Sequence, residues 1–201
     1  MKKTLPLLCL LVFVLVPQTA SARAPNPLTA QMGGLVSHSL DSYHYDFARR
    51  CTGRAQRGTL ALQSWLGNHV RGVTWGIYSC RRTRSGSSVS LHAEGRAVDW
   101  HLDVGKAADR AAADRLVSAF LAPDAAGRPA AMARRMGVQE IIWNCRVWST
   151  KQPIAGMRPY SVCGRGVSRT MAHKDHLHIG LNWRGARERS SFWRLAETAQ
   201  A

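Results

Sequence analysis

Two short stretches of this chain carry side chains that could hold a metal ion. His92 and Asp99 lie in the stretch Ser-Leu-His-Ala-Glu-Gly-Arg-Ala-Val-Asp, and His176 and His178 follow Asp175 in a second stretch much later in the chain. One carboxylate and two imidazoles make a three-ligand site with a fourth position free for water, as in catalytic rather than structural zinc sites. The sequence therefore predicts metal-assisted hydrolytic chemistry, provided that folding brings the two stretches together.

Predicted strands would place these side chains on polar faces. Along a strand, side chains alternate between two faces. A strand over residues 176–182 therefore points His176 and His178 to one face and its aliphatic residues to the core. A second strand, over residues 96–102, places Asp99 on the face opposite its apolar residues.

Asp175 precedes the later strand, in a polar turn. From there its carboxylate can approach a metal-bound water from the side, take up a proton and pass it to a leaving amine. His101 and His173 are close in sequence to the two stretches and could line the same site, or equally be ordinary surface histidines.

The remaining periodicity predicts a mixed α+β domain. Helical spacing favours helices over residues 58–69, 106–121, 129–136 and 185–199, and β-branched or aromatic runs favour strands over 73–78 and 138–143. This order shows no βαβ rhythm, which indicates a mainly antiparallel sheet flanked by helices. Because Trp75, Trp100 and Trp143 lie in predicted strands, we expect them in the core.

The N-terminus has the pattern of a secretory signal peptide. Lys2 and Lys3 precede the apolar run Leu5–Val16, and small residues follow at 20–22. No other apolar run is long enough to span a bilayer, so we expect a secreted or periplasmic mature chain without a membrane span. The predicted organisation is a signal peptide (1–22), a flexible lead-in rich in Pro and Gly (23–40) and one peptidase-like domain (41–201).

Four cysteines follow the signal peptide, and an even number in an exported chain predicts two disulfides. Three pairings are possible, and we favour Cys51–Cys80 with Cys145–Cys163. The second of these would close a short loop that is rich in Pro and Gly.

The chain is strongly basic, with 28 Lys and Arg against 12 Asp and Glu and a formal net charge of +16. Beyond the signal peptide, nearly all of these bases are Arg, whose guanidinium suits bidentate contact with carboxylates and phosphates. An anionic polymer is the expected partner. Charge alone does not choose among cell wall, nucleic acid and anionic lipid.

Both stretches resemble motifs of a known family. The pattern Ser-x-His-x-x-Gly-x-Ala-x-Asp, here residues 90–99, resembles the first zinc motif of the D-Ala-D-Ala metallopeptidases, which share a fold with lysostaphin-type peptidases and the hedgehog signalling domain. Asp175-x-x-His178 resembles the second motif. Trp143-Asn144, Arg158-Pro-Tyr160 and the segment 176–183 are similar to secreted bacterial extensin-like proteins. The resemblance covers roughly residues 72–186.

This resemblance implies that His92, Asp99 and His178 ligate Zn²⁺. It makes Asp175 the general base and His176 a hydrogen-bonding group near the tetrahedral intermediate. The chain departs from the pattern in having Asp at the base position, where many carboxypeptidase relatives have Glu.

Further roles follow for residues around the motifs. Ser90 would hold the first motif loop, and an arginine after an early strand, either Arg81 or Arg82, would steady the charge that develops on the scissile carbonyl. Arg158 and Tyr160 could line a substrate groove or serve the structure.

The leading hypothesis is a monomeric zinc peptidase, a carboxypeptidase or an endopeptidase, that cuts stem peptides or cross-links of peptidoglycan. The expected partner is peptidoglycan or another anionic wall polymer. One alternative is a non-catalytic, zinc-containing wall-binding or interaction domain of the same fold. Another is a secreted nuclease, but the helix expected over residues 185–199 lacks the Asn and His that a common His-metal nuclease motif needs, so we expect no nucleic-acid partner.

Overall fold

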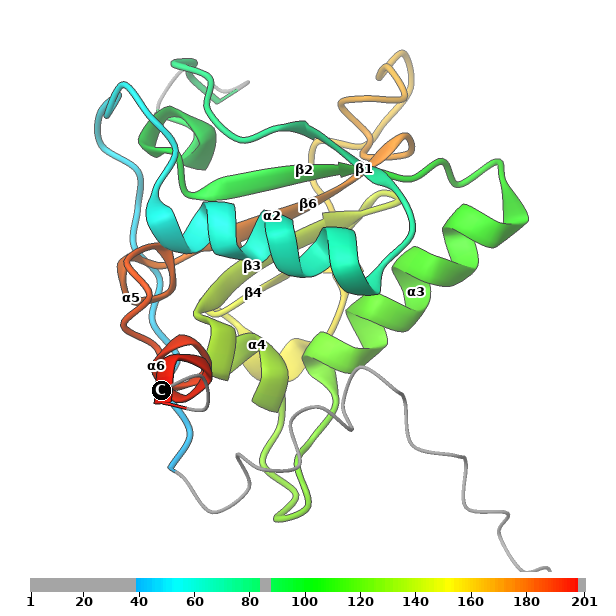
Figure 1. The fold of residues 1–201 in the computed structure, drawn as a ribbon. Helices are drawn as coiled ribbons and strands as arrows, with labels where there is room; N and C mark the ends of the chain where they lie inside the picture. The colour runs from blue at the N-terminus through cyan, green and yellow to red at the C-terminus, as the bar shows by residue number, and fades with distance from the viewer. Residues whose placement is uncertain (1–38, 84–87, 199–201) are drawn as a thin grey trace, which may run out of the picture.

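The computed structural model describes residues 39–83 and 88–198, and there an open six-stranded sheet is flanked by helices (Figure 1). The strand order is β1-β2-β6-β3-β4-β5, and all neighbours are antiparallel. The strands are β1 (Val73–Gly76), β2 (Ala97–His101), β3 (Val138–Trp143), β4 (Arg146–Ser149), β5 (Arg158–Pro159) and β6 (His176–Leu181). The expected α+β class with an antiparallel sheet is confirmed, whereas the predicted signal peptide lies outside the described residues.

The helices pack against one face of this sheet. In Figure 1, α2 lies below β2 in the view and passes in front of β6 and β3, with α3 beside it and α4 below it. The helices are α2 (Arg57–His69), α3 (Ala107–Leu121), α4 (Ala131–Met136), α5 (Trp183–Ala186) and α6 (Ser191–Thr198), with short 3-10 turns η2 (Leu91–Glu94) and η3 (Pro153–Ala155).

The core lies between this helical cover and one face of the sheet. Val98 of β2 and Leu177 and Ile179 of β6 are fully buried there, together with Leu66 of α2 and Phe120 of α3. Because strand side chains alternate, burying these residues turns Asp99, His176 and His178 to the opposite face, as expected. The hydrophobic pattern of the two central strands thus decides which face carries the polar residues.

Two expectations about the fold were wrong. The C-terminal helix is broken into α5 and α6, because the chain turns between them at Glu188, whose φ is +57°. The backbone N–H of Ser191, where α6 begins, donates to Asp41 of the N-terminal segment at 2.9 Å. Trp100 and Trp143 are buried, but Trp75 is 52% exposed on the edge strand β1.

Both favoured disulfides are present, Cys51–Cys80 and Cys145–Cys163. Among the described residues, none of the helices combines the length and apolar character needed to cross a membrane. Disulfides persist in oxidising compartments, so the two bonds are consistent with a secreted or periplasmic protein.

Candidate metal centre

His92, Asp99 and His178 converge on one point above the polar face of the sheet, although they come from η2, β2 and β6. His92 Nε2 lies 3.0 Å from Asp99 Oδ1 and 3.1 Å from His178 Nδ1, and His178 Nδ1 lies 3.0 Å from the same carboxylate oxygen. Asp99 and His178 are directly opposite one another in the β2–β6 ladder, which fixes their proximity. Folding therefore brings together the three residues expected as ligands.

The backbone around η2 holds His92 in place. The Ser90 side chain accepts a hydrogen bond from the His92 backbone N–H at 3.3 Å. His92 Nδ1 donates to the Ile77 carbonyl at 2.8 Å. A carbonyl only accepts, so the proton of a neutral imidazole is on Nδ1 and Nε2 carries the lone pair that faces Asp99.

Gly95 ends η2 and allows the reversal that leads into β2. Its φ is +65°, and a Cβ at this position would lie 2.1 Å from the Arg54 carbonyl oxygen. Only glycine meets both requirements without strain or collision. The segment before α2 can therefore pack directly against the turn that carries His92.

Glu140 lies behind His178 on the neighbouring strand β3. Its Oε1 is 3.7 Å from His178 Nε2, and its Oε2 accepts a hydrogen bond from the Tyr45 hydroxyl at 3.1 Å. If a cation lies between His178 Nδ1 and Asp99, the proton of a neutral His178 ring is on Nε2, and the Glu140 carboxylate on this side supports that tautomer. Sequence reasoning missed Glu140, because its partner only comes close through strand pairing.

The donor set of this cluster fits a metal cation. With these tautomers, three lone-pair-bearing atoms face one another at 3.0–3.1 Å, an arrangement that is repulsive unless a positive charge lies between them. Tetrahedral zinc with bonds of about 2.0–2.1 Å separates its ligand atoms by roughly 3.3 Å, close to this spacing. The His–Asp–His cluster could thus hold a metal ion.

Electrostatics inside the cluster favour the protonation states that a metal needs. Burial raises the pKa of the Asp99 carboxyl, but the hydrogen bonds that His178 and His92 donate to it when they are protonated outweigh burial and hold the pKa well below its usual range. Burial lowers the pKa of His92, and the hydrogen bond that the protonated ring donates to Asp99 opposes the shift. An ionised carboxylate and a neutral imidazole are the forms that bind metal.

Asp175 and His176 form a hydrogen-bonded pair next to the cluster. His176 Nδ1 lies 2.9 Å from Asp175 Oδ1, and His176 Nε2 lies 3.6 Å from Asp99 Oδ1. The Thr170 hydroxyl donates to Asp175 Oδ2 at 2.6 Å. Burial raises the pKa of Asp175, but the hydrogen bonds from Thr170 and His176 lower it overall, so this carboxylate is ionised at neutral pH.

His173 covers the pair from the loop that precedes β6. Its ring centroid lies 4.6 Å from that of His176 and 5.4 Å from that of Tyr160. Burial and the neighbouring His178 and His176 lower the pKa of His173 to about 3, so its ring is neutral. His101 is also part of these surroundings, since its Nδ1 donates to the Asp175 carbonyl at 2.8 Å.

Of the two candidate arginines, Arg81 is the one whose guanidinium the structure places at the cluster, 3.7 Å from Asp99 Oδ2. Arg82 forms an isolated bridge with Val89. Arg158 lies on β5 with a buried Nε that has no hydrogen-bond partner. Tyr160 contacts the site through its ring contact with His173.

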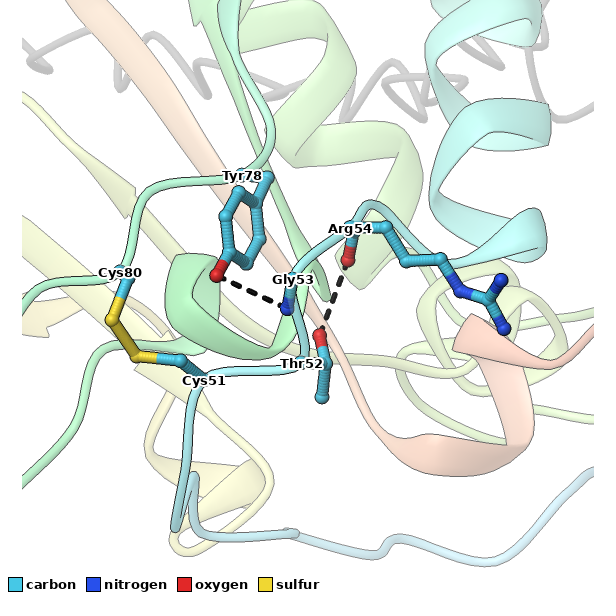
Figure 2. Close-up of a disulfide and its surroundings, with 6 residues drawn as sticks. All are labelled: Cys51, Thr52, Gly53, Arg54, Tyr78 and Cys80. Atoms are coloured by element: carbon cyan, nitrogen blue, oxygen red, sulfur yellow. Dashed lines mark hydrogen bonds between the residues drawn. A yellow bond between two sulfur atoms is a disulfide. The ribbon is translucent and has the colours of Figure 1, made fainter.

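The Cys51–Cys80 disulfide joins two earlier segments of the chain that both contact η2 (Figure 2). The Thr52 backbone N–H donates to the Ala93 carbonyl at 2.9 Å, and Ser79 N–H donates to the His92 carbonyl at 3.2 Å. Figure 2 also shows the Tyr78 hydroxyl accepting a hydrogen bond from Gly53 N–H, at 3.1 Å. Both ends of this disulfide thus support the turn that presents His92.

Fold and site together define an α+β protein with an antiparallel sheet and a His–Asp–His cluster of metal-binding geometry. A family model described as the VldE C-terminal domain matches residues 51–174, which is more than half of the chain, and the protein belongs to that family. The match includes His92 and Asp99 and ends directly before Asp175. No curated protein and no solved structure matches the chain.

Proposed function

We propose that this protein is an exported zinc peptidase that hydrolyses peptide bonds in the stem peptides or cross-links of peptidoglycan. The observation that carries the proposal is the convergence of His92, Asp99 and His178 beside the hydrogen-bonded pair Asp175–His176. Three metal ligands next to a separate proton-accepting group are what metal-assisted hydrolysis requires. In this chain the proposed ligands come from a turn and two antiparallel strands, and this arrangement supports the proposal of a D-Ala-D-Ala metallopeptidase-like fold.

The proposed chemistry divides among a few groups. His92, Asp99 and His178 would hold Zn²⁺, which when bound acidifies water and polarises a carbonyl group. Asp175 accepts a proton and returns it to the leaving amine, and its hydrogen bond holds His176 with Nε2 toward the cluster. The exposed Arg81 guanidinium beside Asp99 is positioned to attract the charge that develops on the scissile carbonyl.

Substrate choice follows from export and charge. The two disulfides are consistent with a compartment outside the cytoplasm, where peptidoglycan is the abundant polymer with anionic peptides. Without Lys2 and Lys3 of the predicted signal peptide, 26 Lys and Arg remain against 12 Asp and Glu, and this net charge of +14 favours association with such a polymer.

The direct test incubates the disulfide-intact mature chain with zinc and whole peptidoglycan, with and without a chelator, and identifies released fragments by mass spectrometry. Chelator-sensitive release is expected, and fragment masses would identify the bond. Binding to the wall without release of any fragment would instead favour a non-catalytic wall-binding domain.

Asp175→Asn tests the assignment of the base. We expect turnover to fall by at least about a hundredfold, the usual contribution of a general base, while one zinc per chain stays bound. Zinc content is measured by atomic absorption on the same samples. If the variant retains full hydrolysis, Asp175 is not the base.

A further inference from the structure

Among the tryptophans that the structure describes, Trp75 is the exposed one. It lies on β1 near the candidate metal centre. The pairing of β1 with β2 shifts register between Thr74 and Gly76, so Trp75 is the extra residue of a β-bulge. Bulges on edge strands re-aim a side chain and are common next to active sites. The indole remains 52% exposed despite its large apolar surface.

The ring contacts of Trp75 fix it relative to the site. It stacks on His101 with centroids 4.4 Å apart and planes 17° apart, and its centroid lies 5.9 Å from that of His176. His101 is held in turn by its hydrogen bond to the Asp175 carbonyl. One indole face is therefore covered by His101, and the exposed part of the ring forms a flat apolar surface beside the Asp175–His176 pair.

A flat, exposed indole complements a ring-shaped ligand with an apolar face. Within the proposed function, on which this inference rests, the rings of the substrate are the pyranose rings of its glycan strand, whose C–H groups form such faces. We propose that Trp75 positions this glycan: it holds a sugar ring at the β1 edge while the attached stem peptide reaches the His–Asp–His cluster. Trp75 is thus a specificity-determining residue for glycan-linked over free stem peptides.

The test compares two soluble probes, a disaccharide-linked stem peptide and the same peptide without its sugars. Wild-type protein is expected to have the higher kcat/KM on the disaccharide-linked probe. Trp75→Ala should lower kcat/KM on that probe about tenfold more than on the free peptide, the size of one aromatic contact, with the loss mainly in KM. Trp75→Phe should keep part of the preference because it retains a flat ring.

Val73→Ala is the matched control, since Val73 is also an exposed apolar residue of β1, 59% exposed, and it has no ring to stack. It should keep the wild-type preference. Near-UV circular dichroism and zinc content verify that each variant is folded and loaded.

The outcomes separate this inference from the proposed function. If wild-type protein cuts both probes and Trp75→Ala leaves their ratio unchanged, the role of Trp75 is wrong and the peptidase stands. If wild-type protein cuts neither probe, the peptidase proposal fails, and calorimetric binding of the disaccharide-linked probe decides on Trp75. Equal Kd values for wild type and Trp75→Ala would then overturn the inference, and a roughly tenfold weaker Kd for the variant would support it.

Discussion

The two sides of the candidate metal centre are both built from irregular chain closed by a disulfide, yet they hold different groups. On the first side, Cys51–Cys80 joins the segments that contact η2, and backbone hydrogen bonds from Thr52 and Ser79 reach the carbonyls of Ala93 and His92. This support acts on a proposed ligand. It fixes where one imidazole of the cluster lies.

On the second side, Cys145–Cys163 closes the region that leads into β6. Cys145 N–H donates to the Ala172 carbonyl at 3.0 Å, and Asn144 N–H donates to the His173 carbonyl at 2.8 Å. These bonds position the loop that covers Asp175 and His176. In the proposed enzyme, metal binding and proton transfer would therefore depend on separate parts of the chain, which variants can distinguish.

Removing groups on the two sides in turn gives the largest expected contrast. His92→Ala deletes a ligand and should weaken zinc binding by about a thousandfold or more, because even loss of an outer-shell partner costs roughly 10–100-fold. His176→Ala should lower turnover but keep zinc affinity near the wild-type value. Competition with a chromogenic chelator measures both affinities. Equal losses of zinc affinity in the two variants would contradict the division.

Replacing the cysteines of each disulfide tests the same difference between the two sides, and we expect a smaller effect than from loss of a ligand. Each bond spans a similar stretch, 29 and 18 residues of sequence separation, so each pair of Cys→Ser substitutions should cost about 3 kcal/mol of unfolding free energy. Zinc affinity should fall only when Cys51 and Cys80 are replaced. Urea unfolding at fixed zinc concentration, with parallel affinity measurements, checks both statements.

For the disulfides, the Cys145→Ser, Cys163→Ser variant is the matched control. It shares the loss of stability and retains the support of His92. A drop in its zinc affinity equal to that of the other variant would show that the metal responds to global stability rather than to local support.

Substitution of Glu140 should give the smallest of these effects. Glu140→Gln removes the carboxylate behind His178 Nε2 and should weaken zinc binding roughly 10–100-fold, since the preference for the metal-binding tautomer is lost. Tyr45→Phe, which removes only the hydroxyl that donates to Glu140, should have a lesser effect. A Glu140→Gln protein with unchanged affinity would show that β3 does not tune the ligand.

Sequence periodicity predicted the central elements well. The helix expected over residues 106–121 is observed as α3, and the strand over 138–143 is β3. Strands β4 and β5 were missed, because four and two residues carry too little periodic signal. The break between α5 and α6 was missed as well, since it depends on the contact of Ser191 with Asp41, far away in sequence.

The candidate ligands could be predicted because their types and spacing form a motif. Their supporting groups could not, since they are defined by tertiary contacts. The Ile77 carbonyl has no side-chain signal at all, and Glu140 is a common residue on a strand. Trp75 was expected in the core because an aromatic strand residue usually packs there, and only the bulge reveals its direction.

The pairing of Asp99 with His178 also affects how this protein folds. Strand side chains repeat with a period of two, so a slip of β2 against β6 by one residue would bury Asp99 and present Val98 to His178. A misaligned sheet would then lack a ligand. An ion that binds only the correctly aligned sheet stabilises it by mass action. If the cluster binds an ion as proposed, the supply of that ion would then favour those newly folded chains whose central strands have aligned correctly.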